Sequence, residues 1–498
     1  MRERVRKIVD KIVQIIGSKY FFWGIIVLFV FQAAWIAFSF RYPMIYDEGY
    51  HFGLIEYFSH QWLPWITNQS TNLDQYGALG RDPYLLYHYL MSFPFRIIDV
   101  LTNNPAVQVI SMRLINIILF ASGIISFWHL LKEMNIKRVF RNVSLLFFVL
   151  LPATPFVAAT INYDSAVFLL TAIFMLVGVK IVKNQKIQWH HYALLVFIGM
   201  TGSLMKSAFT PIFAAGFIFI VIRLLINHKK QVIHDYIKSF KTTGLWLKIV
   251  ILVPVVVVGF LFTERFAVNI VQYHSLVPSC EKQLTEKRCL SSPLELRAYE
   301  LEKNKKGKIP YQDPEYVEKW GSSMLFTLLW SGSSIYGSNG VVKFLDPLPV
   351  IYTVVFISTM VSSMAFFYSF EKLKKISGFW FITSIIILYI STLFYINFSA
   401  YYKYYSPIGI QGRYLLPLLP VLMALALLGI NNILRRVRPF KILILITVFI
   451  LYLSGAGVIT HIVRSNDSWI WDNQTVRQMN DDARDWLSPY VQKWWYDK

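Results

Sequence analysis

The sequence predicts an all-α integral membrane protein with about eleven transmembrane helices. Hydrophobic residues make up 55% of its 498 residues and charged residues only 15%, which is more apolar surface than a soluble core needs. Stretches such as residues 21–40, 249–262, 351–370 and 442–459 are long and almost free of charge. A helix needs about 20 such residues to cross a hydrocarbon core, and it satisfies its backbone hydrogen bonds internally. We therefore expect continuous helical spans.

Apolar runs bounded by charged residues locate the individual spans. The two runs on either side of Lys206 are short, so they are either two helices or one bent or re-entrant element. This choice decides on which side of the membrane every later segment lies. The expected spans are residues 20–40, 106–131, 139–160, 165–183, 191–206, 207–226, 246–268, 347–370, 377–398, 412–430 and 440–462.

Positive charges indicate how these spans are oriented. The formal net charge is +21, which in a soluble protein would suggest a nucleic-acid partner. Here the basic residues fall in alternate connections, the pattern of cytoplasmic loops, so we expect no nucleic-acid partner and a cytoplasmic N-terminus in a plasma membrane. The first helix is expected to stay as an anchor, because its basic flank leads into a full-length apolar run. The basic clusters are residues 2–11, 132–141, 180–186, 223–248, 372–375 and 435–441.

The predicted topology places two long segments on the extracytoplasmic side. Residues 1–462 form one polytopic unit in this prediction, followed by an extracytoplasmic, tryptophan-rich tail at residues 463–498. Loop 41–105 is dense in Tyr, Trp, His and Pro, and we expect it to hold the active site. Loop 269–346 is polar and is expected to form a small extracytoplasmic excursion. Short interfacial helices are expected in the first loop at residues 53–58 and 84–98.

Both cysteines of the chain, Cys280 and Cys289, lie in the second long loop. An oxidising compartment would allow them to form a small disulfide. Two free thiols are the alternative, because closeness in sequence does not establish bonding geometry.

Acidic side chains open the first long loop, directly after the first span. Asp47 and Glu48 are adjacent at the lipid boundary, where a partly desolvated carboxylate can act as a general base or hold a cation. A solvated acidic loop start is the alternative interpretation. Polar and aromatic residues further along form the mixture typical of carbohydrate sites, although interfacial packing explains each one singly. The further substrate-binding candidates in this loop are His51, Arg81, Asp82 and His88.

Charged residues at the ends of later spans are candidates for the same site. Asp164 returns to the side of Asp47, although an N-cap role explains it equally well. Lys206 interrupts an apolar stretch and needs a partner, for which a lipid phosphate is suited; snorkelling at a helix end is the alternative. Arg413 could clamp a phosphate bidentately, with Gly412 permitting close approach, or it could simply mark the interface. The aromatic candidates for substrate binding beside it are Tyr405 and Tyr414.

Taken together, these motifs resemble those of the GT-C superfamily of polytopic glycosyltransferases, which includes protein mannosyltransferases and aminoarabinose transferases that use polyprenyl-phosphate sugars. The resemblance extends over most of residues 20–460. Its elements are the acidic pair Asp47 and Glu48, the Asn-x-Asp that ends at Asp164, a glycine and lysine at residues 199 and 206, and the Gln-Gly-Arg-Tyr-x-x-Pro at residues 411–417.

The resemblance implies an inverting transfer from a polyprenyl-phosphate sugar to a lipid, glycan or protein acceptor at the extracytoplasmic face. Asp47 would be the general base that deprotonates or orients the acceptor, and Glu48 a second catalytic carboxylate beside it, while Lys206 and Arg413 would neutralise the departing phosphate. No cofactor is expected. A divalent metal held by His51 and the two acids is a less favoured alternative.

Two other classes of protein fit the composition. A transporter or flippase would carry ionisable or helix-breaking residues near the membrane midplane and internal repeats, but mid-span charges are few, Arg113 being one, and no repeat is visible. A non-catalytic lipid-binding protein would keep the architecture and lose Asp47 or Lys206, and both are present.

Overall fold

The computed structural model is all-helical throughout the residues that it describes, which confirms the predicted fold class. Its one pairing of extended backbone in that part of the chain is an isolated bridge between Phe40 and Ile470. The described residues are 2–184, 188–227, 231–305, 315–329, 349–406, 408–434, 438–453, 455–465 and 467–491.

Eight helical stretches among the described residues are long and apolar enough to cross a membrane. A ninth is counted if α6 (Arg138–Val149) and α7 (Ala153–Ala159), which meet at an angle of 69°, form one broken span. The eight stretches are α2 (Lys19–Ser39), α5 (Pro105–Glu133), α8 (Asp164–Lys183), Ser207–Ile226 in η2 (Ser207–Phe209) and α10 (Thr210–Asn227), α12 (Leu245–Tyr273), Val350–Leu373 in α16 (Pro349–Leu373), α17 (Phe379–Tyr404), and Leu445–Arg464 in α19 (Arg438–Leu453) and α20 (Gly457–Arg464).

Of about eleven expected spans, eight or nine meet this measure of length and composition among the described residues, and the others correspond to shorter helices. The predicted span 139–160 is interrupted where Pro152, which lacks a backbone N–H, lies between α6 and α7. The predicted span 191–206 corresponds to α9 (Trp189–Met205), which has 17 residues. The predicted span 412–430 begins as the short 3-10 helix η5 (Gly412–Leu415) and continues as α18 (Leu419–Ile433), which has 15 residues.

Lys206 separates two helices rather than interrupting one. α9 ends at Met205, and the single 3-10 turn η2 leads from Lys206 into α10. The backbone N–H of Lys206 still bonds to the carbonyl oxygen of Gly202, at 3.1 Å. Of the two arrangements that the sequence left open, the structure has two helices.

Short helices occupy both long connections. In the first connection, α3 (Glu48–Ser59) packs against α4 (Leu86–Leu101), with the 3-10 helix η1 (Thr71–Tyr76) between them in sequence. Helices were expected at 53–58 and 84–98, and both are present. The second connection contains η3 (Cys280–Lys282), α13 (Glu286–Cys289), α14 (Pro293–Lys303) and α15 (Tyr316–Leu328), while its residues 306–314 and 330–348 lie outside the described part.

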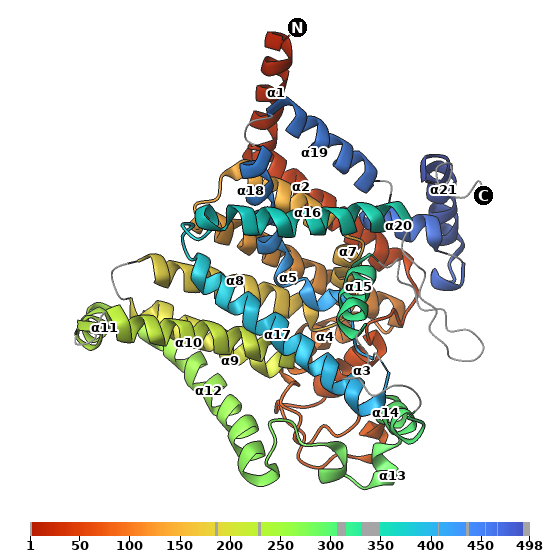
Figure 1. Ribbon diagram of the computed structural model, residues 1–498. Coiled ribbons are helices and arrows are strands. Elements are labelled where there is room, and N and C mark those ends of the chain that lie inside the picture. The colour runs from red at the N-terminus through yellow and green to blue at the C-terminus, as the bar shows by residue number, and fades with distance from the viewer. Residues whose placement is uncertain are drawn as a thin grey trace.

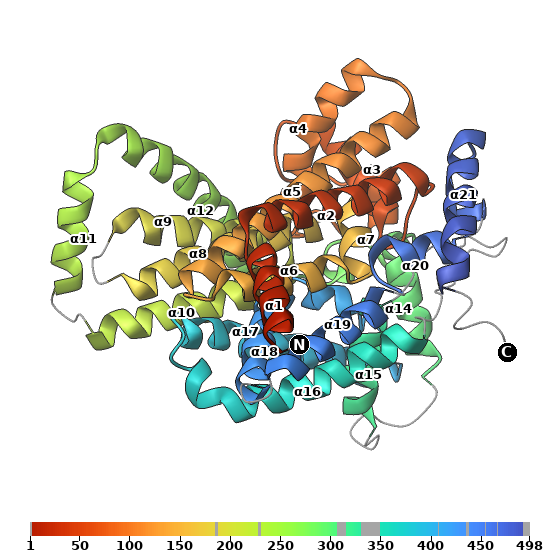
Figure 2. The same cartoon turned by 90° about the horizontal axis from the view of Figure 1, so that it is seen from above.

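The remaining helices are α1 (Arg2–Ile16), α11 (Gln231–Thr242), η7 (Asp467–Trp469) and α21 (Gln474–Val491). In both overall views α3, α14 and α21 lie towards one side of the molecule and α11 lies at the other, with the long spans between them (Figure 1, Figure 2). The connections that carry most of the candidate site residues are therefore separated from the basic segment at α11 by the length of the helices.

The centre of the bundle is formed where α5, α6 and α8 meet. The ring of Phe168 on α8 stacks on Phe120 of α5, with centroids 4.1 Å apart, and on Phe148 of α6, at 5.4 Å. All three side chains are buried. By contrast, α12 leaves large apolar side chains such as Phe260 exposed, 63% of its surface being accessible. An apolar exposed face of this kind fits contact with lipid. Asp164 lies at the first residue of α8, so the rigid centre of the bundle holds it in place.

Candidate functional site

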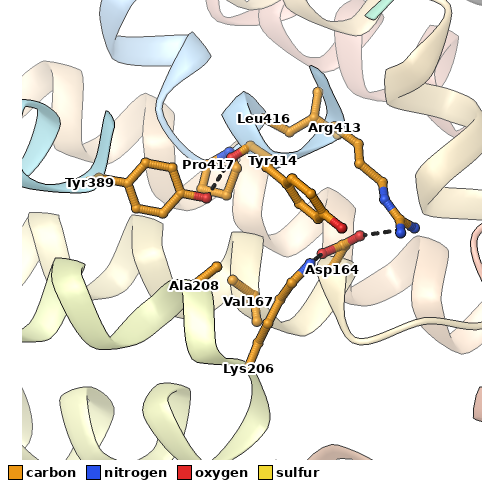
Figure 3. A pocket seen from close by; sticks show the side chains of 9 residues that line it. All are labelled: Asp164, Val167, Lys206, Ala208, Tyr389, Arg413, Tyr414, Leu416 and Pro417. Carbon is orange, nitrogen blue, oxygen red and sulfur yellow. Dashed lines mark hydrogen bonds and ion pairs between the residues drawn. The ribbon is translucent and has the colours of Figure 1, made fainter. Parts of the chain in front are cut away.

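Three charged side chains from separate parts of the chain meet at one pocket. Asp164 begins α8, Lys206 lies between α9 and η2, and Arg413 lies in η5. The ammonium group of Lys206 pairs with Oδ1 of Asp164, and Nη1 of Arg413 lies 3.6 Å from Oδ2 of the same carboxylate. Figure 3 shows the Asp164 carboxylate between the two cations. The other residues that line the pocket are Val167, Ala208, Tyr389, Tyr414, Leu416 and Pro417.

Tyrosine rings surround both cations. The ammonium nitrogen of Lys206 lies 4.4 Å from the ring centroid of Tyr163 and 4.5 Å from that of Tyr414. The guanidinium carbon of Arg413 lies 4.2 Å from the ring centroid of Tyr46. Contacts of this geometry stabilise a cation that has lost water. The rings therefore allow two positive charges to remain buried side by side.

A hydrogen bond from α17 fixes the turn that carries Arg413. The hydroxyl of Tyr389 donates to the backbone carbonyl oxygen of Tyr414, at 2.6 Å (Figure 3). Behind the turn, the backbone N–H of Gly412 donates to Oγ1 of Thr327 on α15, at 2.5 Å. Gly412 was expected to permit close approach to a phosphate. In the structure it permits close approach of η5 to α15, because a Cβ on it would lie 2.1 Å from the carbonyl oxygen of Met324.

The guanidinium of Arg413 is buried with few hydrogen-bond partners. Only 3% of its side chain is exposed, and its Nε is buried without a hydrogen bond to any described residue. Its contacts with the carboxylates of Asp164 and Asp47 are 3.6 Å and 3.5 Å long. Charge-assisted hydrogen bonds of this type are usually about 2.7–2.9 Å. Arg413 therefore has donor capacity that the surrounding side chains do not use.

Asp47 lies at the open edge of the same cluster. Its side chain is 53% exposed, and it reaches Nη2 of Arg413. The backbone φ angles of Tyr46 and Asp47 are 69° and 63°, a left-handed conformation that is unfavourable for residues with a Cβ. This backbone conformation places the Asp47 carboxylate next to Arg413 and the ring of Tyr46 over the guanidinium.

Glu48, the neighbour of Asp47, is fully buried and does not line the pocket. Its Oε1 and Oε2 accept hydrogen bonds from Nε and Nη2 of Arg113, at 2.8 Å and 2.7 Å. The backbone N–H groups of Ile161 and Met44 donate to the same two oxygens, at 3.2 Å and 2.7 Å. The expectation of a second catalytic carboxylate at Glu48 does not agree with this placement, because both oxygens are already engaged.

His51 and His88 form a buried pair next to the pocket. Nδ1 of His51 and Nε2 of His88 are 2.8 Å apart, and each residue is only 2% exposed. The ring of Tyr163, which contacts Lys206, lies 4.5 Å from the ring of His51. Burial lowers the pKa of His88 to about 3. Burial, followed by His88 and then by the charges of Arg413 and Lys206, lowers the pKa of His51 well below its usual value. Both imidazoles are therefore neutral at pH 7.

Arg81, Asp82 and Tyr405 do not line the pocket. Arg81 binds Glu264 of α12, with Nη1 to Oε1 at 2.7 Å, and so joins the first connection to α12. Asp82 accepts a hydrogen bond from the backbone N–H of Tyr84, at 2.9 Å, and burial raises its pKa to about 6. Tyr405 ends α17, where Lys305 lies 5.8 Å from its ring.

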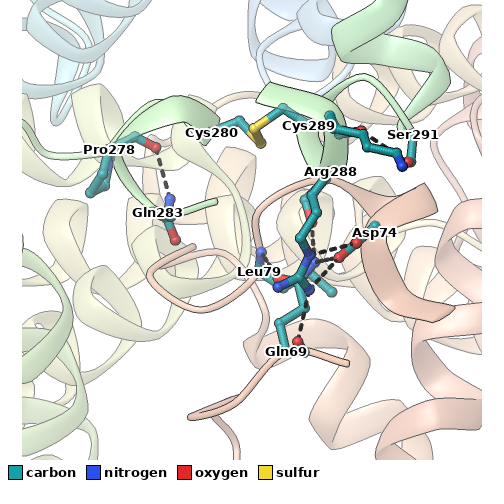
Figure 4. The surroundings of a disulfide bond; sticks show 11 residues. Gln69, Asp74, Leu79, Pro278, Cys280, Gln283, Arg288, Cys289 and Ser291 are labelled. Atoms are coloured by element: carbon teal, nitrogen blue, oxygen red, sulfur yellow. Dashed lines mark hydrogen bonds and ion pairs between the residues drawn. A yellow bond between two sulfur atoms is a disulfide. The ribbon is translucent and has the colours of Figure 1, made fainter. Parts of the chain in front are cut away.

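Cys280 and Cys289 form a disulfide in the second connection. It lies beside Arg288, whose Nε and Nη2 bind the two carboxylate oxygens of Asp74, each at 2.7 Å (Figure 4). Nη2 of Arg288 also donates to the backbone carbonyl oxygen of Gln69, at 2.8 Å. The disulfide loop is therefore bonded to residues 69–74 of the first connection.

Several contributors to the cluster were not found from the sequence. Tyr46, Tyr163 and Tyr389 were not singled out, because tyrosine is common at membrane interfaces. Arg113 was noticed only as an uncommon mid-span charge, although such a charge calls for a buried partner. No group of three His, Cys, Asp or Glu side chains suited to a metal ion was found among the described residues.

The helices define a multi-pass integral membrane protein, and its pocket contains a buried cluster of paired charges. The chain belongs to the family described as predicted membrane protein (DUF2142), whose model matches residues 59–422. No curated protein matches it.

A solved structure that resembles the chain is the archaeal oligosaccharyltransferase AglB from Archaeoglobus fulgidus, in complex with an inhibitory peptide and a dolichol-phosphate. The two chains are 12% identical, with a TM-score of 0.42. The match covers 94% of this chain and 60% of AglB, so the chain spans about three fifths of the length of that protein.

Proposed function

We propose that the protein is a membrane glycosyltransferase that moves a sugar from a polyprenyl-phosphate donor to an acceptor at the extracytoplasmic face. The observation that carries this proposal is that Lys206 and Arg413 line one pocket, while the carboxylate of Asp47 contacts Arg413 at its edge. The pocket contains two cations suited to a phosphate and, at its open edge, a carboxylate suited to a hydroxyl. The motifs that these residues belong to are those of the GT-C resemblance.

Lys206 and Arg413 supply the charge that a leaving phosphate requires. As the bond to the sugar breaks, negative charge develops on the phosphate, and fixed cations in a water-poor site stabilise it more strongly there than in water. Arg413 has unused donors in a planar fork that matches phosphate oxygens. The apolar side chains of Val167, Leu416 and Pro417 line the same pocket and keep water away from these charges.

Asp47 is the proposed general base. Its carboxylate is 53% exposed, so an acceptor hydroxyl can reach it, whereas Asp164 is 10% exposed and engaged with both cations. The acceptor oxygen attacks the anomeric carbon from the face opposite the phosphate. The carbon–oxygen bond to the phosphate then breaks, its electron pair leaves with the phosphate, and the acceptor proton passes to Asp47. A single displacement of this kind inverts the anomeric centre.

Glu48 acts indirectly in this proposal. Its carboxylate binds Ile161 and Met44 in addition to Arg113, and these two residues flank the turns that carry Asp164 and Asp47. It is therefore a positioning residue for both acids. The acceptor is a lipid, glycan or protein hydroxyl, and the extracytoplasmic location follows from the distribution of basic residues.

The test is transfer of radiolabelled sugar from a panel of polyprenyl-phosphate sugars to membrane extracts, with the protein in nanodiscs. Asp47→Asn is expected to reduce transfer by about 100- to 10,000-fold, the usual contribution of a general base, while donor binding is retained. Glu133→Gln serves as a control, because it removes a carboxylate that pairs with Lys183 at the other end of α8. Equal transfer by wild type and Asp47→Asn, or no donor binding by folded wild type, would overturn the proposal.

A further inference from the structure

Asp164 occupies the position between the two cations where an anionic ligand would be expected to bind. One oxygen of its carboxylate pairs with Lys206 and the other faces Nη1 of Arg413, so the carboxylate bridges the two cations (Figure 3). A phosphate monoester offers the same arrangement, with two oxygens on one centre. The cations therefore already hold an anion, and it belongs to the protein.

We propose that Asp164 is a displaceable counter-anion, which holds the site for a single phosphate group and leaves Arg413 when that phosphate binds. The inference rests on the proposed function for the identity of the ligand, a lipid monophosphate. It assigns to Asp164 a role in the release of phosphate as well as in its binding.

The two contacts of Asp164, with Lys206 and with Arg413, differ in length, and this difference indicates which one breaks when phosphate binds. Asp164 pairs closely with Lys206, but it lies 3.6 Å from Arg413, and its Oδ2 is buried without a hydrogen bond to any described residue. Nε of Arg413 is equally without a hydrogen bond. A phosphate oxygen that binds the guanidinium would accept from its unused N–H donors, so exchanging the loose carboxylate contact for a phosphate contact gains hydrogen bonds.

The local charge balance explains why such a counter-anion is useful. Lys206, Arg413 and Asp164 are each at most 10% exposed, and the second carboxylate near Arg413, that of Asp47, is 53% exposed. Two buried cations without Asp164 would bind a phosphate tightly and would also retain it as the product. With Asp164 present, the carboxylate can return to Arg413 as the phosphate leaves, so the cations are never left without a partner.

The experiment compares phosphate binding by wild type, Asp164→Asn and Asp164→Glu in nanodiscs. The probes are inorganic phosphate and farnesyl phosphate, whose dissociation constants are measured by thermal shift and by equilibrium binding. Asp164→Asn is expected to bind both probes at least about tenfold more tightly, which corresponds to about 1.4 kcal/mol. Asp164→Glu keeps the competing charge and is expected to stay near wild type. If the gain appears with farnesyl phosphate alone, the site requires the lipid portion.

Controls separate this role from a merely structural one. Glu133→Gln removes the same charge at the opposite end of α8, about 30 Å away by helical rise, and is expected to leave affinity unchanged. Asp164→Ser provides a second neutral variant if Asp164→Asn does not fold. In Asp164→Asn with Lys206→Met, affinity is expected to fall back towards wild type.

Unchanged or weaker phosphate binding by the neutral variants would overturn the inference, because it would mean that Asp164 only holds the cations in place. The outcome is independent of sugar transfer. If the neutral variants bind phosphate more tightly but wild type transfers no sugar from any donor, the inference stands and the proposed transferase function fails. If transfer is present, Asp164→Asn is expected to lower kcat and KM together, as slow product release requires.

Discussion

Glu48 and Arg113 are joined by a two-fold hydrogen-bonded ion pair, and neither side chain has any exposed surface. The pair ties together segments that are far apart in sequence. Glu48 also accepts a hydrogen bond from Ile161 near the start of α8, while Arg113 donates through Nη1 to backbone carbonyl oxygens at the end of α2. Both acid-bearing turns of the pocket therefore depend on one buried pair.

Removing one partner of this pair is expected to be severely destabilising. Arg113→Leu leaves the Glu48 carboxylate buried without its counter-charge, and loss of one member of a buried pair typically costs about 3–5 kcal/mol. The variant should give a large fall in the midpoint of thermal unfolding in detergent. Glu371→Gln is the matched control, since it breaks an exposed pair with Lys374 and should change stability by less than about 1 kcal/mol. Equal midpoints for Arg113→Leu and wild type would contradict the structural role of the pair.

Gly412→Ala is expected to displace the turn that carries Arg413. The added Cβ would meet the backbone carbonyl oxygen of Met324 at 2.1 Å, so η5 or α15 must move. Overpacking of this kind costs about 1–3 kcal/mol, and here it should also weaken farnesyl phosphate binding. Gly24→Ala is the control, because a Cβ on Gly24 meets no atom within 4 Å. Wild-type phosphate affinity in Gly412→Ala would show that Arg413 does not depend on this packing.

Several charged residues of the pocket could be predicted from sequence for a physical reason. A charge at the end of an apolar run is costly unless it has a partner, so Lys206, Asp164 and Arg413 stand out from their surroundings. Their meeting at one pocket also requires that α8, α9 and η5 end near one another. Lys206 lies at the junction between α9 and η2, so its side chain is at a helix end, where it can meet the other two charges.

The pairings themselves could not be predicted, because they join residues that no local pattern relates. Glu48 and Arg113 are 65 positions apart, and Arg81 and Glu264 are 183 positions apart. The expectation for Gly412 was wrong for the same reason. Its place beside Arg413 suggested close approach to a phosphate, but a Cβ on it would lie 2.1 Å from the backbone carbonyl oxygen of Met324, so this glycine serves helix packing. Which neighbour a glycine accommodates depends on the tertiary fold.

Loss of the disulfide is expected to loosen the first connection as well as the second. Replacing both Cys280 and Cys289 by serine opens a loop of about ten residues, which in the chain-entropy model is worth about 2–3 kcal/mol. Arg288 lies next to Cys289 and binds Asp74, so hydrogen exchange should become faster in residues 69–79 as well as in 280–289. Arg288→Gln keeps the disulfide and should affect residues 69–79 mainly. If hydrogen exchange in residues 69–79 is unchanged in the double-serine variant, the disulfide does not stabilise the first connection.

The His51 and His88 pair is expected to make the first connection sensitive to acid. Burial lowers the pKa of His88 from 6.5 to about 3, so the unfolded chain binds protons more readily than the folded protein between these values. The stabilising contribution is therefore complete above pH 6.5 and is lost as the pH falls towards 3, by at most about 1.4 kcal/mol per pH unit for each histidine. The midpoint of thermal unfolding should therefore be lower at pH 5 than at pH 7.5.

A non-titrating variant distinguishes this effect from general acid damage. His88→Asn should narrow the difference between the two midpoints, because one of the two neutral imidazoles no longer gains a proton on unfolding. Asp82 acts in the opposite sense. Burial raises its pKa from 3.8 to about 6, so its folded form holds a proton more readily and its contribution weakens as the pH rises between these values. Asp82→Asn should therefore widen the difference that His88→Asn narrows, and parallel shifts in both variants would contradict the assignment.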